Sequence, residues 1–263
     1  MSDTVKAFGS GSFEAVDYQV MRHAYASQNE LGRLCDECIY QTDLKARLLA
    51  EGFRSVATEV PVKVTHRDFS RTYYLDLVAD DALHELKASA GLTGEHVAQL
   101  LNYMFLLGIP RAKLLNFRTP KVQGKIVATS LTTPARSRFS TSASHWLDLS
   151  EACKSLRSRC CELLQDWGAF LELGLYQEAL VHFLGGIHNL ERRVTLSRSE
   201  TALGTQRMLV HAPDIAFRVT AVTDSRILEL HLSRLLAATQ LKAIQWINLN
   251  HAQIEFRTVT LRS

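Results

Sequence analysis

The order of hydrophobic patterns in residues 18–130 limits the folds that this chain can adopt. Apolar residues recur at helical spacing over 18–50, and Gly52 follows at the point where a helix would end. Strand-like runs are expected at 56–64, 71–78 and 82–88, a second helix from the N-cap Thr93 to about 107, and further strands at 112–117 and 125–130. This order predicts a mixed α/β domain with helices flanking a central sheet.

A chain of 263 residues can form one large domain or two smaller ones. We expect a loose N-terminal arm at 1–18, a first domain at 19–130, a linker rich in Ser, Thr and Arg at 131–147, and a second domain at 148–263.

The second half of the chain weakly repeats the first. Residues 217–232 (FRVTAVTDSRILELHL) align without gaps with 73–88 (YYLDLVADDALHELKA). The alignment pairs Thr220 with Asp76 and His231 with Lys87, and it keeps a glutamate at positions 85 and 229. Helical periodicity over 149–184 and a resemblance of 244–261 to the LLNF segment extend the similarity. An internal repeat predicts a fused pseudo-dimer, with two unrelated hairpins of similar composition as the alternative.

Charged residues embedded in apolar strands mark a candidate active site. A tight turn at residues 80–81 would place Asp76 opposite Glu85, and Lys87 shares the face of Glu85 because strand side chains alternate. The oxygens of both carboxylates, with the Leu86 carbonyl as a further ligand, suit Mg²⁺ or Mn²⁺. The alternative is a lattice of surface salt bridges.

Further polar residues are candidates for the same site. Glu37 lies on the first predicted helix, and Gln99 and Tyr103 share one face of the second because they are four residues apart. Together with Lys87 as a group that positions or deprotonates water, this set suits metal-assisted phosphodiester hydrolysis. Taken singly, Glu37 can also be an exposed helix charge and Tyr103 a core aromatic.

Positive charge is concentrated in one stretch. No Asp or Glu occurs between His96 and Leu147. The basic residues there that we predict to contact nucleic-acid phosphates are Arg111, Lys113, Arg118, Lys121 and Lys125, and Arg136 and Arg138 follow them. A basic surface without a ligand is an equally good interpretation of the charge alone.

Cysteines and hydropathy exclude other classes of protein. The cysteine count is five, which is odd, and the adjacent pair at 160–161 does not fit a metal or iron–sulfur motif, so we expect small buried thiols. We find no signal peptide and no apolar run of the roughly 20 residues that a membrane span needs. We therefore expect a cytoplasmic protein without a membrane partner.

Four segments together resemble a known family. The runs LGRLCDECIYQTDLKARLLAEGF, TEVPVKV, YLDLVADDALHELKAS and EHVAQLLNYMFLLGIPRAKLLNF resemble the GxxExxY proteins of the PD-(D/E)XK nuclease superfamily, which are similar to RecB-type and lambda-exonuclease-type domains. Glu37 and Tyr40 take the Glu and Tyr of the naming motif, whereas its Gly falls on Leu34. The superfamily positions fall on Asp76, Glu85 and Lys87, and the QxxxY motif on Gln99 and Tyr103.

The resemblance implies a restriction-endonuclease-like fold and a Mg²⁺- or Mn²⁺-dependent nuclease whose substrate we expect to be DNA. It also implies an active first copy and a second copy with a dead site. The alternative is a non-catalytic nucleic-acid-binding or protein-interaction subunit of a defence or repair complex. Either a monomeric pseudo-dimer or a homodimer is compatible with the sequence.

Overall fold

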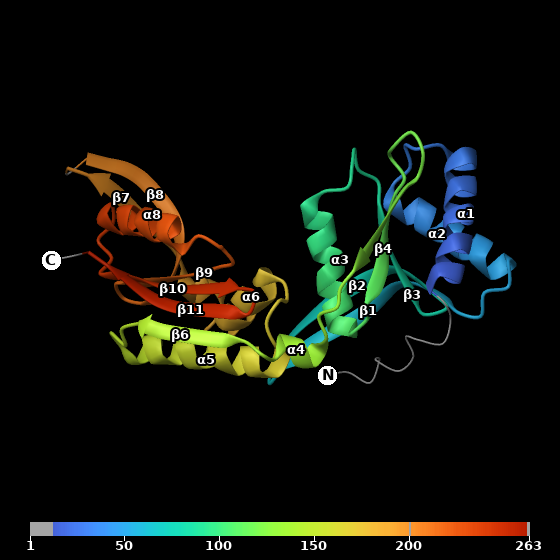
Figure 1. Ribbon diagram of the computed structural model, residues 1–263. Coiled ribbons are helices and arrows are strands. Elements are labelled where there is room, and N and C mark those ends of the chain that lie inside the picture. The colour runs from blue at the N-terminus through green and yellow to red at the C-terminus, as the bar shows by residue number, and fades with distance from the viewer. Residues whose placement is uncertain (1–12, 200, 262–263) are drawn as a thin grey trace. The chain divides into compact units, whose positions relative to one another are not determined.

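The computed structural model describes residues 13–199 and 201–261, and it divides into two compact units (Figure 1). The N-terminal unit comprises Met1–Thr65 and Ser70–Thr132, and the C-terminal unit comprises His66–Phe69 and Thr133–Ser263. Most of the expected arm at 1–18 lies outside the described residues, and its last six residues belong to a helix. Each unit contains a mixed sheet flanked by helices, so the predicted α/β fold class is confirmed.

The helical region at 18–50 forms two helices, where the sequence predicted one. Helix α1 (Phe13–Leu31) ends at Gly32, whose φ of 75° is left-handed and suits glycine, and α2 (Glu37–Ala50) starts five residues later. The hydroxyl of Tyr40 donates to the Gly32 carbonyl at 2.8 Å and ties α2 to the end of α1. A positive φ at a single residue is not visible in hydrophobic periodicity, which is why the break was missed.

The N-terminal sheet has the strand order β1-β2-β3-β4-β5. Its strands are β1 (Val56–His66), β2 (Phe69–Ala79), β3 (Ala82–Lys87), β4 (Arg111–Asn116) and β5 (Gln123–Ala128). β2 and β3 are antiparallel around the turn at Asp80 and Asp81, which both have positive φ. β3 and β4 are parallel and are connected by α3 (Gly94–Leu107), and β5 returns antiparallel to β4.

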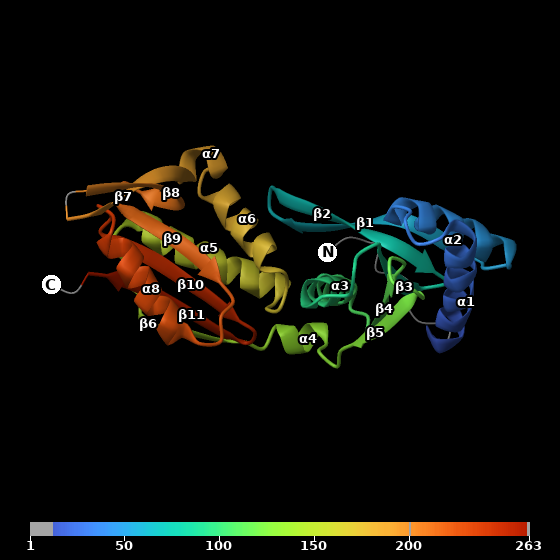
Figure 2. The ribbon, with the colours of Figure 1, turned by 90° about the horizontal axis from the view of Figure 1, so that it is seen from above.

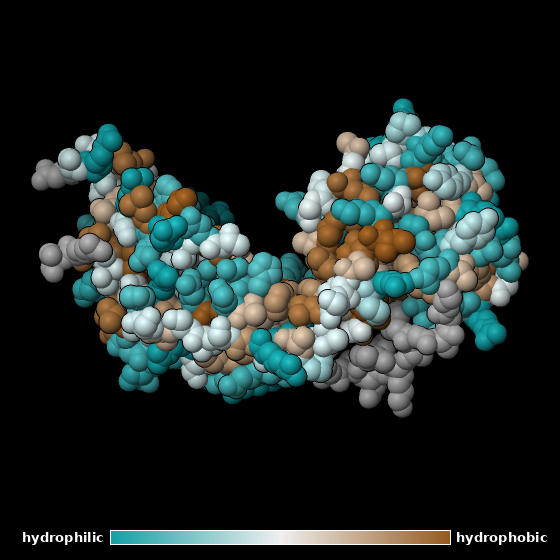
Figure 3. All heavy atoms as spheres, viewed as in Figure 1, coloured by the Kyte–Doolittle hydropathy of each residue, from teal (hydrophilic) through white to brown (hydrophobic). Residues whose placement is uncertain are grey.

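Helices cover both faces of this sheet (Figures 1 and 2). Tyr40 and Leu44 of α2 pack with Leu77, Leu86 and Leu115 on one face, and all of these are at most 1 % exposed. On the other side α3 turns its buried stripe to the sheet. Figure 3 shows apolar side chains gathered over α3, which also carries half-buried apolar residues outside that stripe. Full burial of each large side chain contributes about 1.5–3 kcal/mol.

The C-terminal unit contains a second mixed sheet, of order β6-β11-β10-β9-β8-β7. Its elements are α4 (Thr133–Arg136), β6 (Ser140–His145), α5 (Glu151–Trp167), α6 (Leu173–Phe183), α7 (Ile187–Leu190), β7 (Glu191–Arg198), β8 (Thr201–Ala212), β9 (Ile215–Thr220), α8 (Ser225–Ala237), β10 (Ala243–Asn250) and β11 (Gln253–Thr260). Strand β6 lies within the expected linker at 131–147, where it pairs in parallel with β11.

Five strands of this sheet share the connectivity of the N-terminal sheet. In both units a pair of longer helices, α1 and α2 or α5 and α6, precedes an antiparallel meander of three strands, and in the C-terminal unit the one-turn helix α7 intervenes. A helix then leads to a parallel fourth strand and an antiparallel fifth. The gapless alignment of 217–232 with 73–88 is nevertheless wrong in its details. Glu229 and His231 lie in α8, not in a strand, and β9 takes the place of β3.

Helices in the described part of the chain are all too short or too polar to cross a lipid bilayer.

Candidate active site

Asp76, Glu85 and Lys87 come together where β2 and β3 separate. The two strands pair only from Leu77 to Ala79, so Asp76 lies one residue beyond the ladder. Its Oδ2 accepts the N–H of Leu86 at 2.7 Å and thereby replaces a main-chain partner. Lys87 Nζ lies 2.8 Å from Glu85 Oε1 and 3.9 Å from Asp76 Oδ2. The hairpin turn and the two-residue period of the strands account for this cluster.

The site contains more buried negative charge than it neutralises. The side chain of Glu85 is 1 % exposed, and burial, followed by the negative charge of Asp76, raises its pKa to about 8. Burial also raises the pKa of Asp76. Burial opposes the charged form of Lys87, but the charge and hydrogen bond of Glu85 raise the Lys87 pKa. Two carboxylates therefore share a single ammonium group in a poorly solvated place.

The two side-chain oxygens of Glu85 have different surroundings, since only Oε1 accepts a hydrogen bond from Lys87. Glu85 Oε2 is buried and has no hydrogen-bond partner among the described residues. Burying a charged carboxylate oxygen without a donor costs several kcal/mol, on the order of a lost charged hydrogen bond. A cation bound to that oxygen would remove this cost. The donor set of hard carboxylate oxygens fits Mg²⁺ or Mn²⁺, which need only one or two protein carboxylates because they retain water ligands.

Histidine, cysteine, aspartate and glutamate side chains do not form a group of three or more that would hold a metal, as far as the described residues go. The fit of a cation therefore depends on the two carboxylates Asp76 and Glu85. Leu86 lines the adjacent cavity, and the role of its carbonyl as a ligand stays a prediction.

Glu37 lies next to this cluster. It occupies the first turn of α2, and its Oε1 accepts the N–H of Ala88, just beyond the end of β3, at 2.8 Å. Its negative charge contributes to the raised pKa of Asp76, after burial, which is the larger cause. The structure thus brings the acid predicted on the first helix to the end of the strand that carries Glu85 and Lys87.

Gln99 and Tyr103 share one face of α3, as their spacing predicts. Gln99 Nε2 donates to the Tyr103 hydroxyl at 3.0 Å. Burial raises the pKa of Tyr103, and the negative charges of Glu85 and Asp76 raise it further, so the phenol lies within electrostatic range of both carboxylates. A neutral hydroxyl and an amide beside two carboxylates can orient a water molecule or a phosphate oxygen.

Two further residues of the site were not predicted. Gln41 Nε2 donates to the main-chain oxygen of Asp76 at 2.6 Å and to Glu59 Oε1 at 2.8 Å. Both residues line a cavity of about 220 Å³ together with Glu37 and Asp76. The four-residue spacing from Glu37 on one helix was an available signal for Gln41. No such signal indicated Glu59, because its positive φ of 52° interrupts the regular alternation of β1.

The predicted basic surface is smaller than the sequence indicated. Lys113 is 7 % exposed, and its Nζ lies 2.6 Å from Asp17, so this lysine is a core residue and not a phosphate contact. Arg136 is 1 % exposed in the C-terminal unit. Arg111 is exposed and forms an ion pair with Glu14. The remaining predicted contacts are the half-buried Arg118 and the exposed Lys121 and Lys125.

Comparison with known proteins gives a match for the N-terminal unit alone. Searches of curated proteins and of solved structures find no significant match. One family model does match, and the matched segment runs from α1 to β5 and contains every residue of the candidate site. Residues 14–127 thus match the model of the PD-(D/E)XK nuclease superfamily.

Proposed function

We propose that the N-terminal unit is a divalent-metal-dependent nuclease that hydrolyses phosphodiester bonds of DNA. The observation that carries this proposal is the buried Glu85, whose Oε2 lacks a donor and whose Oε1 binds Lys87 beside Asp76. Within a domain that matches the PD-(D/E)XK nuclease superfamily, such a charge deficit is best explained by a cation between the two carboxylates.

Each residue of the site has a distinct role in this proposal. Asp76 and Glu85 hold the cation, which when bound lowers the pKa of a water ligand and polarises the phosphodiester. Lys87, anchored by Glu85, neutralises the negative charge that develops on the phosphate and can hold or release a proton at Nζ. Gln41 keeps the Asp76 main chain in place, and the Gln99–Tyr103 pair orients the phosphate.

We further assign the N-terminal unit to the GxxExxY group, on the Glu37-x-x-Tyr40 spacing. We also interpret the C-terminal unit as a degenerate second copy of the same fold, which would make the chain a pseudo-dimer. Its support is the shared connectivity and one repeated contact: the hydroxyl of Tyr176 donates to the carbonyl of Gly168, eight residues earlier, as Tyr40 does to Gly32. Both glycines have a positive φ, of 77° for Gly168 and 75° for Gly32.

Cleavage assays with single- and double-stranded DNA test the proposed nuclease. In Mg²⁺ or Mn²⁺ the wild-type protein is expected to cut at least one substrate, and a chelator is expected to stop it. Glu85→Gln and Lys87→Met should each lose at least a hundredfold in rate because each removes one charge from the site. Glu229→Gln is the matched control, since the glutamate at 229 lies on α8 of the C-terminal unit.

Two outcomes separate the proposal from its alternatives. Undiminished cleavage by Glu85→Gln, with circular dichroism unchanged, would contradict the assigned site. Absence of cleavage in the wild type, together with Mn²⁺ binding that requires Asp76 and Glu85, would instead favour a subunit that is active only within a defence or repair complex.

A further inference from the structure

The register of the C-terminal sheet locates the counterpart of the active site. In parallel ladders, Thr220 of β9 pairs with Asn248 of β10, as Lys87 of β3 pairs with Asn116 of β4. Counting back two residues from Thr220 places Arg218 at the position of Glu85. The C-terminal unit thus carries an arginine where the N-terminal unit carries its most buried carboxylate.

The neighbouring strand and helix give the other counterparts. Leu209 pairs with Phe217 on β8 and β9, in the way that Leu77 pairs with His84 on β2 and β3. The residue before Leu209, at position 208, is a methionine and stands where Asp76 stands in the first sheet. On the second helix, Gln177 follows Tyr176 as Gln41 follows Tyr40. The acidic pair is therefore replaced by methionine and arginine, while the glutamine is kept.

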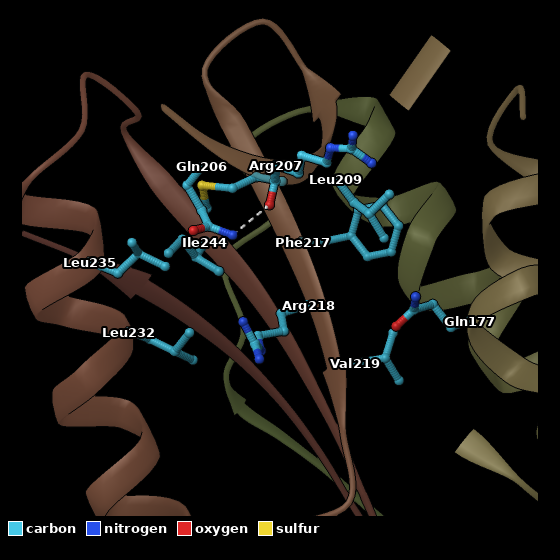
Figure 4. Close-up of a pocket in the computed structure, with 11 residues that line it drawn as sticks. Gln177, Gln206, Arg207, Leu209, Phe217, Arg218, Val219, Leu232, Leu235 and Ile244 are labelled. Carbon is cyan, nitrogen blue, oxygen red and sulfur yellow. Dashed lines mark hydrogen bonds between the residues drawn. The ribbon is translucent and has the colours of Figure 1, made fainter. Parts of the chain in front are cut away.

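These counterparts line a cavity of about 390 Å³. Figure 4 shows Arg218 between Leu232 and Leu235 of α8 on one side and Gln177 of α6 on the other, with Gln206 and Arg207 on β8. Aspartate and glutamate are absent from the described residues that line it. Because strand side chains alternate, Arg218 and Gln206 extend to the α8 side of the sheet, and Arg207 and Gln177 lie on the other side. A cavity of this size with an apolar wall and a few polar groups is typical of a small-ligand site.

Arg218 is available for a ligand. It is exposed, and its guanidinium forms no hydrogen bond or ion pair with any residue that the structure describes. Arg207, the other cation of the lining, has a long contact of 3.7 Å to Glu191, and both side chains of that pair are exposed. Surface pairs of this kind contribute about 0–1 kcal/mol, so Arg207 can also turn to an anion.

The side chains that line the cavity favour a ligand in which a phosphate group is attached to an apolar part. A guanidinium presents a planar fork of N–H groups that binds phosphate oxygens in pairs, and the amide of Gln206, on the same side of the sheet as Arg218, adds a neutral donor. The apolar wall formed by Met208, Leu232 and Leu235 suits the flat face of a base better than a bare anion.

We propose that this cavity is a second, non-catalytic site that binds the phosphate and base of a nucleotide. The source is either a free mononucleotide or the 5′-phosphorylated end of a nucleic-acid strand, since both present the same phosphomonoester. Binding here requires no activity of the N-terminal unit.

Calorimetric titration of the full chain in chelator, on a Glu85→Gln background, tests this site without cleavage. The probes are thymidine 5′-monophosphate, thymidine, and a five-nucleotide DNA strand with or without a 5′-phosphate. We expect the monophosphate to bind at least tenfold more tightly than thymidine. Arg218→Ala should weaken it at least tenfold, and Arg218→Lys less, because an ammonium keeps the charge but not the fork.

Arg226→Ala is the matched control, because Arg226 lies on α8 with its side chain 90 % exposed and does not line the cavity. It should leave binding unchanged, and thermal melting should be similar for all variants. Tighter binding of the 5′-phosphorylated strand than of the monophosphate identifies a strand end, and equal binding identifies a mononucleotide; either supports the proposal.

Failure to bind either phosphorylated probe at millimolar concentration would overturn it. Equal binding of thymidine and its monophosphate, or no effect of Arg218→Ala, would do the same. A wild-type protein that does not cut DNA but shows Arg218-dependent nucleotide binding would remove the proposed nuclease activity and leave this site standing.

Discussion

Asn116 and Asn248 form the same pair of hydrogen bonds in two sheets of the same connectivity. Asn116 Nδ2 donates to the Ser89 carbonyl, and its Oδ1 accepts the Ser89 N–H, at 2.9 and 3.1 Å. Asn248 makes both bonds to Val222, each at 2.9 Å. Each asparagine thereby holds the chain just beyond the end of the neighbouring strand. In the N-terminal unit that strand ends with Lys87, so the contact also positions the candidate site.

Replacing each asparagine in turn distinguishes an effect on stability from an effect on DNA cleavage. Asn116→Ala and Asn248→Ala should each lower the free energy of unfolding by about 1–3 kcal/mol, because half-buried main-chain groups lose their partner. Only Asn116→Ala should also slow DNA cleavage, since it releases the chain after Lys87. Urea denaturation and the cleavage assay check both effects. A similar loss of activity in both variants would argue against a positioning role that is specific to Asn116.

Gln41 and Gln177 provide a second matched pair. Gln41→Ala should reduce cleavage about 10- to 100-fold, the usual cost of removing a residue that orients a metal ligand, because the Asp76 main chain and Glu59 lose their donor. Gln177→Ala should leave cleavage intact, because Gln177 lies on α6 of the C-terminal unit. The prediction fails if Gln41→Ala cuts at the wild-type rate.

The raised pKa of Glu85 predicts how stability depends on pH in the absence of metal. Between the ordinary value of 4.5 and about 8, the folded protein holds a proton that the unfolded chain has released. The free energy of unfolding should therefore fall as pH rises through this window, since folding retains the proton. Glu85→Gln should flatten that dependence. Denaturation in chelator at pH 5, 6.5 and 8 measures it, and equal slopes for both proteins would contradict the prediction.

The affinity for a divalent metal should rise with pH, whereas the metal-free stability should fall. Binding between Asp76 and Glu85 displaces the proton, so apparent Mn²⁺ affinity should increase from pH 5.5 to pH 8. Saturating Mn²⁺ should raise the melting temperature of the wild type, because a ligand that binds only the folded state stabilises it. Asp76→Asn should lose this thermal shift, and an unchanged shift would exclude Asp76 as a ligand.

Substitution of Asp17 tests the contribution of a buried ion pair to the stability of the N-terminal unit. It binds Lys113 at 2.6 Å and His84 at 3.2 Å; burial raises its pKa, but these contacts outweigh burial and lower the pKa overall. Asp17→Ala should cost about 3–5 kcal/mol, because it leaves the Lys113 ammonium buried without its partner. The double variant Asp17→Leu, Lys113→Met should recover much of that loss in urea denaturation. A cost below 1 kcal/mol for Asp17→Ala would show that water reaches Lys113.

Local patterns were enough to predict the strands and α3 of the N-terminal unit and the proximity of three charged residues. Asp76, Glu85 and Lys87 lie on one hairpin, where a short turn and a two-residue period fix relative positions without distant contacts. The same reasoning failed for α8. Leu228, Leu230 and Leu232 alternate as in a strand, yet the segment is a helix that buries Leu232 and Leu236 and leaves Leu230 49 % exposed. A run this short supports both periods, and packing decides between them.

The sequence by itself determined the mixed α/β class and the identity of the charged hairpin, because both depend on neighbours along the chain. Only the tertiary structure decided which distant residues join them. Gln41 reaches Asp76 because Gly32 turns α2 back onto the sheet, and Lys113 leaves the basic surface because Asp17 of α1 lies beside it in the core. Arg218 is the counterpart of Glu85 through strand register alone, and register depends on which strands pair, not on the order of residues within one strand.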